Sequence, residues 1–186
     1  EDSVVTIGEN AFMNCNKFTG DLIIPDNVVK IGKYAFGNCS GFNGNLKLSK
    51  NLKEINEFTF MCCGGLIGDL TIPDSVTLIG KGAFQYCKGF NGKIYIGKET
   101  TRIEQVAFME CSSLTGDLII PNNVTYIGSS AFQGCAGLTG DLLIPSSVET
   151  IVGGAFNDCS GFSGTLTVGM KNIPGTGLFT STKFSR

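Results

Sequence analysis

Cysteines carry the most reactive side chains in this chain, and seven of the eight recur at one fixed spacing. They stand at every 24th position, as Cys15, Cys39, Cys63, Cys87, Cys111, Cys135 and Cys159. Thiolates bind zinc, but structural zinc sites need ligands two to four residues apart or histidine partners. These cysteines lie a full period apart and the chain has no histidine. The spacing therefore argues against a metal site.

A ladder of disulfides fits the spacing little better. Equivalent side chains of stacked repeats point the same way, so their Cβ atoms stay near the strand spacing of about 4.8 Å. A disulfide needs converging Cβ atoms about 3.5–4.5 Å apart. Free cysteine packs well as a small buried hydrophobe. We therefore predict a column of buried thiols, with Cys62, which stands out of register, partly exposed.

Carboxylates also recur, but their column is interrupted. Asp21, Asp69, Asp117 and Asp141 share one position with Asn45, Lys93 and Thr165. Calcium needs six to eight converging oxygens, and a lysine in the row opposes this. We predict a solvated rim without a metal. Acid–base catalysis without histidine would need paired carboxylates or an activated lysine, and no such cluster is visible. The sequence predicts no catalytic or cofactor-binding residue and no enzyme activity.

The charge balance excludes two further classes of partner. The net charge is −2, with 14 basic residues scattered among 16 acids. Nucleic acids and anionic membrane surfaces attract proteins with a basic patch, which is lacking here. No apolar run approaches the roughly 20 residues of a membrane-spanning helix. We expect no nucleic acid partner and no membrane span in this sequence.

The elements that position these side chains follow from the same period. Phenylalanine recurs every 24 residues from Phe12 to Phe156, isoleucine from Ile7 to Ile151 and glycine from Gly20 to Gly164. A fixed period in this range predicts one supersecondary unit stacked on copies of itself. Each copy is too small to bury its apolar face alone, so stacking must form the core.

Residues 121–144 show the expected unit. Asp141–Ile144 is predicted to be a short strand that ends at Pro145, with Leu142 and Ile144 facing inward. The equivalent inward pairs are Leu22/Ile24, Leu46/Leu48, Leu70/Ile72, Ile94/Ile96, Leu118/Ile120 and Leu166/Val168. Gly140 directly precedes the strand, and its column suggests a backbone position that needs a positive φ or a close approach.

Two further segments complete the unit. Val124–Ile127 is predicted to be a second extended stretch. Residues 129–134 are expected to form a short helical or 3-10 turn that Ser129 caps, with Ala131 and Phe132 directed inward. We therefore predict a solenoid of short parallel strands, extended segments and short helical or 3-10 turns.

The domain boundaries follow the repeat. Residues 1–169 are expected to be one solenoid of seven 24-residue repeats. Glu1–Val4 aligns with Pro73–Val76, so the sequence starts mid-repeat, and we expect a longer protein. Residues 170–186 lose the pattern, because Thr180 and Lys183 stand where phenylalanine and cysteine are expected. Phe179 and Phe184 either cover the last repeat as a degenerate cap or belong to a frayed tail.

The repeat resembles a known family. The motif Ala-Phe-x-x-Cys-x-x-Leu-x-Gly-x-Leu-x-Ile-Pro-x-x-Val-x-x-Ile-Gly stands complete from Ala107 to Gly128. It resembles the BspA-type leucine-rich repeat, also called the TpLRR class, whose usual unit is one residue shorter. The resemblance implies a leucine-rich-repeat solenoid in a cell-surface or secreted protein that acts in adhesion or host-protein binding.

One outward column is a candidate binding surface. The central residue of each strand is expected to face outward: Ile23, Lys47, Thr71, Tyr95, Ile119, Leu143 and Thr167. Tyr95, Ile119 and Leu143 would form contiguous exposed apolar surface, which often marks an interaction site. The alternative is that aromatic and β-branched residues simply suit strands.

Two functions remain open from the sequence. The first is a binding or adhesion module that recognises a protein or glycan of a host or neighbouring cell through the sheet face and adjacent loops. The second is a structural spacer or self-associating stalk that presents other domains. The sequence does not decide the oligomeric state.

Overall fold

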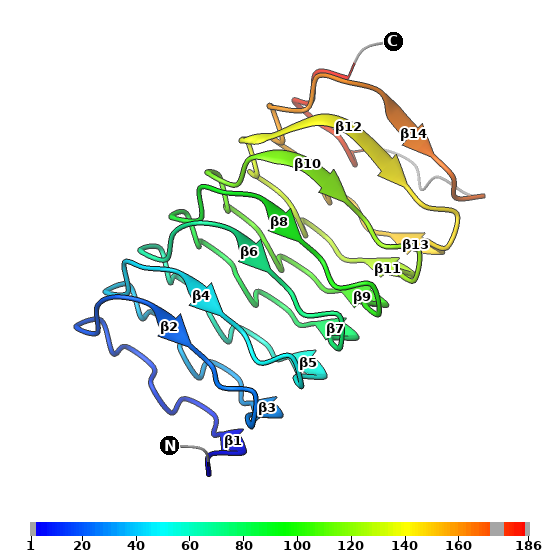
Figure 1. The fold of residues 1–186 in the computed structure, drawn as a ribbon. Coiled ribbons are helices and arrows are strands. Elements are labelled where there is room, and N and C mark those ends of the chain that lie inside the picture. The colour runs from blue at the N-terminus through cyan, green and yellow to red at the C-terminus, as the bar shows by residue number, and fades with distance from the viewer. Residues whose placement is uncertain (1–2, 172–176, 185–186) are drawn as a thin grey trace.

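The computed structural model describes residues 3–171 and 177–184, in which the chain forms a parallel β-solenoid (Figure 1). Fourteen short strands and no helix are present among these residues. Each of the seven 24-residue repeats contributes two strands; we number the repeats 1 to 7, from residues 1–24 to residues 145–168. The predicted leucine-rich-repeat solenoid with short parallel strands is confirmed.

The strands form two rows, each with one strand from every repeat. The odd-numbered row comprises β1 (Thr6–Ile7), β3 (Lys30–Ile31), β5 (Glu54–Ile55), β7 (Leu78–Ile79), β9 (Arg102–Ile103), β11 (Tyr126–Ile127) and β13 (Thr150–Ile151). The even-numbered row comprises β2 (Leu22–Ile23), β4 (Leu46–Lys47), β6 (Leu70–Thr71), β8 (Ile94–Tyr95), β10 (Gly116–Ile119), β12 (Leu138–Ile144) and β14 (Leu166–Val168).

Hydrogen bonding differs between the two rows. From β5 to β13 the odd-numbered strands form one five-stranded sheet in register, as in the pair Ile79↔Ile103. The even-numbered strands instead form three separate sheets, β2-β4, β6-β8 and β10-β12-β14. The even-numbered row is therefore interrupted twice along the stack, after β4 and after β8.

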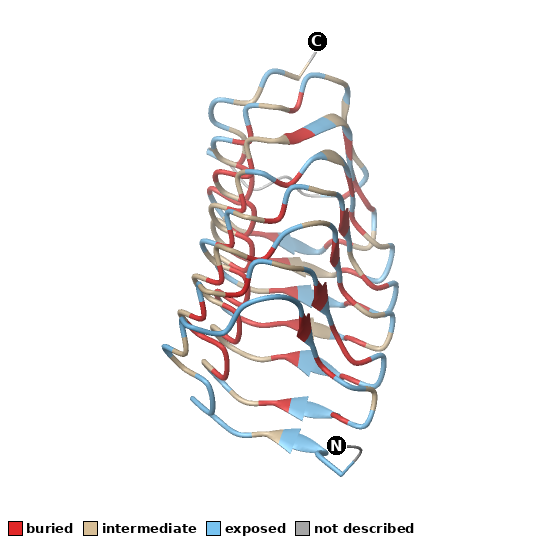
Figure 2. Ribbon diagram, turned by 60° about the vertical axis from the view of Figure 1, so that its left-hand side comes forward, coloured by how far each residue is buried: buried red, intermediate tan, exposed pale blue. Residues whose placement is uncertain are grey.

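The core consists of columns of identical residues. Consecutive rings of the phenylalanine column, from Phe12 to Phe156, stack with centroids 5.1 to 5.5 Å apart. Phe60, Phe84, Phe108, Phe132 and Phe156 are completely buried. Figure 2 shows this buried interior between the two rows of strands. Phe12, in repeat 1, is the exception, with 38% of its surface exposed.

The inward strand positions also match the prediction. Leu70, Ile72, Leu142 and Ile144 have 2% or less of their surface exposed. Ile96, Leu166 and Val168 are only half-buried, although they pack against the core. Alternate residues therefore face the interior, as the strand geometry requires.

The expected helical or 3-10 turns are wrong in detail. Ala131 and Phe132 are buried as predicted, but residues 129–134 form successive turns rather than a helix. The amide of Gln133 bonds to the carbonyl of Ser130 within the repeat, at 3.2 Å. The amide of Phe132 instead bonds across to Ala155 of the next repeat, at 2.8 Å. Ser129 donates its hydroxyl to the Gly153 carbonyl, at 2.9 Å, instead of capping a helix.

Left-handed residues explain why no helix forms there. Two positions of the turn region, four residues apart, have a positive φ in every repeat. The first column comprises Asn10, Tyr34, Phe58, Gly82, Val106, Ser130 and Gly154. The second comprises Asn14, Asn38, Cys62, Tyr86, Glu110, Gly134 and Asp158. A right-handed helix cannot continue through such positions.

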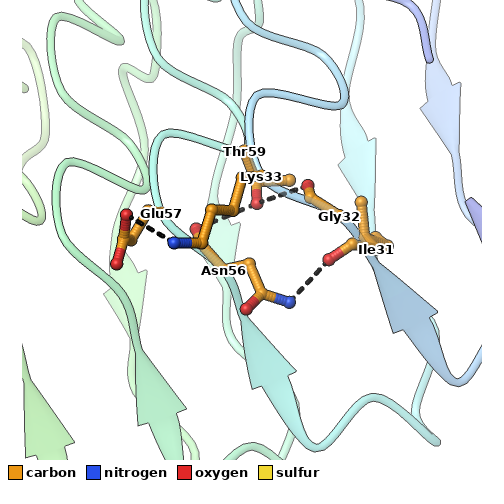
Figure 3. Close-up of polar contacts among 6 residues, drawn as sticks. All are labelled: Ile31, Gly32, Lys33, Asn56, Glu57 and Thr59. Carbon is orange, nitrogen blue, oxygen red and sulfur yellow. Dashed lines mark hydrogen bonds and ion pairs between the residues drawn. The ribbon is translucent and has the colours of Figure 1, made fainter. Parts of the chain in front are cut away.

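Polar contacts between repeats satisfy the buried backbone, as Figure 3 shows for repeats 2 and 3. Asn56 donates from its side chain to the carbonyl of Ile31, at 2.7 Å. Thr59, which is fully buried, donates its hydroxyl to the carbonyl of Asn56 in the same repeat, at 2.9 Å, and to that of Gly32 in the preceding repeat, at 3.4 Å. Lys33 and Glu57 form an exposed ion pair at 3.0 Å. Among the described residues, every buried side-chain nitrogen or oxygen has a partner.

The C-terminal segment contacts the last repeat. Phe179 stacks on Phe156 at 5.4 Å, and Phe184 stacks on Phe162 at 5.4 Å. The amide of Phe156 bonds to the carbonyl of Leu178, at 3.0 Å. Phe179 follows Phe156 by 23 residues, so this last turn is one residue shorter than the repeat. Residues 172–176 and 185–186 of the segment lie outside the described residues, as do Glu1 and Asp2 at the expected mid-repeat start.

Candidate binding surface

The predicted outward column lies on the even-numbered row. Ile23, Lys47, Thr71, Tyr95, Ile119, Leu143 and Thr167 are all exposed. The register places Thr71 beside Tyr95, and Ile119 beside Leu143. Ile119 has 76% of its surface exposed, and Tyr95 and Leu143 have about half. Tyr95, Ile119 and Leu143 thus form an apolar strip over β8, β10 and β12, which we call the apolar strip.

Two shallow grooves flank Ile119. The first, about 260 Å³, lies between β8 and β10 and is lined by Lys93, Ile94, Tyr95, Ile96, Asp117 and Ile119. The second, about 390 Å³, lies between β10 and β12 and is lined by Asp117, Leu118, Ile119, Ile120, Gly140, Asp141 and Leu143. The apolar strip is therefore flanked by two grooves, and two charged residues line each of them.

The first groove coincides with a break between two sheets of the even-numbered row. β8 is hydrogen-bonded to β6, and β10 to β12, but β8 and β10 belong to different sheets. In the register of β10 with β12, Asp117 pairs with Thr139 whereas Ile119 pairs with Leu143, so β12 bulges. Breaks and bulges of this kind re-aim side chains at a sheet surface.

The column of aspartates before the even-numbered strands, predicted as a solvated rim, also joins neighbouring repeats. Asp21, Asp69 and Asp141 are exposed, but each carboxylate accepts the backbone amide of the next repeat. The acceptor–donor pairs are Asp21 with Asn45 at 2.7 Å, Asp69 with Lys93 at 2.7 Å, and Asp141 with Thr165 at 2.6 Å. The glycine before each amide is required, because a Cβ atom on Gly44 or Gly92 would overlap the carboxylate oxygen. Asp117 makes no such bond.

A reciprocal side-chain clamp joins repeats in pairs, which sequence reasoning missed. Asn43 accepts the amide of Gly20 at 2.7 Å, in the direction opposite to the bond from Asn45 to Asp21. Asn91 accepts the amide of Gly68 at 2.9 Å and completes the same arrangement with Asp69. The clamps hold β2 to β4 and β6 to β8, which are the two-stranded sheets of this row. The signal was present, because Gly-Phe-Asn-Gly occurs at 41–44 and again 48 residues later.

The loops that follow the even-numbered strands are joined in the same pairs as the strands. Asp26 forms an ion pair with Lys50 at 3.0 Å, and Asp74 with Lys98 at 3.3 Å. The backbone amide and side chain of each lysine hold the pKa of the aspartate below its ordinary value. These four charges are thereby paired between repeats 2 and 3 and between repeats 4 and 5. The loops that follow Ile119 and Leu143 of the apolar strip carry Asn122 and Ser146 at the same position.

The thiol column is buried and hydrogen-bonded. All eight cysteines are free. From Cys39 to Cys159 each periodic thiol donates to the phenylalanine carbonyl of the preceding repeat, at 2.9 to 3.1 Å. Burial raises the pKa of Cys63, Cys111 and Cys159 to about 12, so these thiols stay protonated and unreactive. Cys62 is half-buried, as predicted, and Cys15 is half-buried as well.

Neither a metal cluster nor a membrane-crossing helix occurs in the described part of the chain. No group of three histidine, cysteine, aspartate or glutamate side chains in residues 3–171 and 177–184 could hold a metal ion. Within the same residues, no helix is long and apolar enough to span a bilayer.

Comparison with solved structures shows which proteins have a similar fold. The chain is similar to a leucine-rich cell surface protein from Faecalibacterium prausnitzii, with a TM-score of 0.58 and 24% identity, over 89% of this chain and 59% of that protein. It is also similar to the T. pallidum leucine rich repeat protein (TpLRR), with a TM-score of 0.55 and 26% identity, over 73% of this chain and 72% of that one. No curated protein matches the chain.

The sequence of the repeat identifies the family. The family described as the BspA type leucine rich repeat region matches in six copies, over residues 5–139, 68–163 and 90–184. These matches cover most of the chain, including the phenylalanine and cysteine columns that form the core. The chain belongs to the BspA-type leucine-rich-repeat family.

Proposed function

We propose that this solenoid is the binding module of a cell-surface or secreted adhesion protein, and that the apolar strip contacts its partner. The observation that carries the proposal is the exposure of Tyr95, Ile119 and Leu143 on three consecutive strands, with a groove on either side of Ile119. Tyrosine is enriched among residues that dominate binding energy, because it offers a broad ring and a hydroxyl.

The family supports the coarser part of the proposal. The chain belongs to the BspA-type leucine-rich-repeat family, and the similar protein of F. prausnitzii is described as a cell surface protein. The chain spans 59% of the length of that protein, so the activity of a whole protein of this kind remains a proposal. The partner class is a protein or a glycan of a host or neighbouring cell.

The experiment first finds a partner and then removes the apolar strip. The chain would be screened on a glycan array and against extracellular proteins. Tyr95→Ala combined with Ile119→Asp should abolish binding to the partner found, with the thermal unfolding midpoint unchanged, because both side chains are exposed. The control is Tyr126→Ala in β11 combined with Val29→Asp at the residue before β3, and this variant should bind normally.

The spacer or stalk function predicts the opposite result for the Tyr95→Ala/Ile119→Asp variant. A spacer presents other domains and uses no particular surface column. Undiminished affinity in a folded Tyr95→Ala/Ile119→Asp variant would exclude the apolar strip as the contact surface. The loops after the even-numbered strands would then be the next surface to change.

A further inference from the structure

The two asparagines of the clamps that accept a glycine amide are followed by the residue that makes asparagine chemically labile. Asn43 precedes Gly44 and Asn91 precedes Gly92, and no other asparagine of the chain precedes a glycine. The backbone nitrogen after an asparagine can attack the side-chain carbonyl carbon of that asparagine. The attack is fastest at glycine, which has no side chain to obstruct it. Both asparagines are exposed, so water and hydroxide reach them.

The reaction needs only water as a co-reactant. At Asn43, the Gly44 nitrogen loses its proton and forms a bond to Cγ, the bond from Cγ to the side-chain nitrogen breaks, and ammonia leaves. Water then opens the resulting succinimide ring at one of its two carbonyls. Opening at one carbonyl gives aspartate. Opening at the other gives isoaspartate, in which the main chain runs through the former side chain.

In the structure, both reacting groups of the first site are bonded to one glycine of the preceding repeat. The Gly20 amide donates to Oδ1 of Asn43 at 2.7 Å, and the Gly44 amide donates to the Gly20 carbonyl at 3.0 Å. While both bonds hold, the proton of the Gly44 amide is held by Gly20, and Asn43 cannot turn its carbonyl carbon toward the Gly44 nitrogen. The closed clamp therefore opposes the attack.

The second site has the same geometry. The Gly68 amide donates to Oδ1 of Asn91 at 2.9 Å, and the Gly92 amide donates to the Gly68 carbonyl at 3.0 Å. Neither Asn43 nor Asn91 is buried. At both sites the hydrogen bonds of the clamp, and not exclusion of solvent, oppose the reaction.

A further hydrogen bond on each segment allows the two clamps to be loosened separately. The Asn45 amide, directly after Gly44, donates to Asp21 at 2.7 Å. The Lys93 amide, directly after Gly92, donates to Asp69 at 2.7 Å. Removal of either carboxylate loosens one clamp, while the asparagine and glycine that react stay in the chain.

We propose that Asn43 and Asn91 are modification sites that stay intact while their clamp is closed and convert to isoaspartate and aspartate when it opens. Isoaspartate adds one carbon atom to the main chain before the glycine. The former side-chain carbonyl then lies in the main chain, so the clamp cannot close again in its original register. Separation of β2 from β4, or of β6 from β8, thereby leaves a permanent covalent change.

The first test compares the folded chain with the same chain unfolded in guanidinium chloride. Both would be kept at mildly alkaline pH, and peptide mapping by mass spectrometry would follow aspartate and isoaspartate at residues 43 and 91. Both sites should react roughly tenfold or more slowly in the folded protein. Equal rates in the folded and unfolded protein would overturn the proposal, and this comparison needs no variant.

Two variants separate the opening of one clamp from the unfolding of the whole chain. Asp21→Ala should accelerate the reaction at Asn43 about fivefold and leave Asn91 unchanged, because it removes one hydrogen bond from the first clamp alone. Asp69→Ala should accelerate the reaction at Asn91 alone. Asp21→Asn is the matched control. It removes the charge but keeps an acceptor oxygen, so it should leave the Asn43 rate nearly unchanged.

The other outcomes would overturn the proposal. Equal acceleration of both sites by Asp21→Ala would mean that the reaction proceeds from the globally unfolded chain and not from an open clamp. Equal acceleration by Asp21→Asn and Asp21→Ala would mean that the carboxylate charge, and not the hydrogen bond, slows the reaction. Unchanged rates in both alanine variants would mean that opening of the clamp does not limit the modification.

Discussion

The thiol of Cys111 donates a hydrogen bond to the carbonyl oxygen of Phe84, one repeat earlier, at 3.1 Å. The same carbonyl accepts the backbone amide of Cys87, also at 3.1 Å. Cysteine suits this position because its weak donor reaches a carbonyl while its small apolar body fills the core. This arrangement makes the thiols sensitive reporters of the folded state.

Thiol reactivity should separate the cysteines into two groups. In the native protein a thiol reagent should modify Cys15 and Cys62, because only these two are half-buried. After unfolding without any reductant all eight should react, since all eight are free. Mass spectrometry of the modified peptides would identify the sites. Fewer than eight modifications after unfolding would mean that disulfides exist.

Stability should fall in alkaline solution because of the buried thiols. Burial raises the pKa of Cys111 to about 12 from an ordinary value of 9.0, so the folded state holds its proton more tightly than the unfolded state. The contribution is complete below pH 9 and is lost as the pH rises toward 12. Each such thiol should contribute a loss of about 1.4 kcal/mol per pH unit in that window.

Urea unfolding at a series of pH values would measure this loss. Cys111→Ala should show a shallower decline above pH 9 than the parent protein, because the variant lacks this buried thiol. Equal slopes for the two proteins would contradict the assignment of the alkaline loss to Cys111.

The phenylalanine column should carry much of the stability. Phe84 is completely buried between Phe60 and Phe108, with centroids 5.3 and 5.5 Å away. Phe84→Ala should lower the free energy of unfolding by about 3–5 kcal/mol. Phe12→Ala is the matched control and should cost about half as much or less, because Phe12 is partly exposed. Equal losses at the two positions, measured by chemical denaturation, would be inconsistent with the burial of the column.

The rim aspartates should differ in their effect on stability. Asp69→Ala removes the acceptor of the Lys93 amide and should cost about 1 kcal/mol. Asp69→Asn keeps an acceptor oxygen and should cost less. Asp117→Ala removes no such bond and should change stability by about 0.5 kcal/mol or less. Thermal and urea unfolding of the three variants would test this order, which a purely solvated rim would not produce.

Val106 should be a site where glycine stabilises the protein. Its φ of 51° lies in the left-handed region, which is unfavourable for a β-branched residue. Gly82 and Gly154 occupy the same position in other repeats. Val106→Gly should raise the free energy of unfolding by about 1 kcal/mol. Gln105→Gly, at the preceding residue without a positive φ, is the control and should lower it by about 0.5–1 kcal/mol.

The sequence by itself determined the fold, the core and the outward column. A stacked array repeats one environment by translation, so a residue type that recurs every 24 positions identifies a buried column without knowledge of the coordinates. The burial of Phe84, Cys111 and Leu142 followed from that argument, and so did the exposure of Tyr95 and Ile119.

Only the tertiary structure decided how neighbouring repeats are joined. The bond from the Lys93 amide to Asp69 links residues 24 apart through a side chain, and neither residue type alone signals it. The left-handed backbone at Tyr34 and Val106 accompanies a hydrogen bond from each amide to a carbonyl of the next repeat, that of Glu57 and that of Ser129. Phe179 reaches Phe156 because the last turn is one residue shorter, so strict periodicity assigned its place to Thr180. In each case the contact that decides the structure lies between two repeats. A small departure from exact periodicity changes such a contact but leaves the repeated sequence pattern almost unaltered.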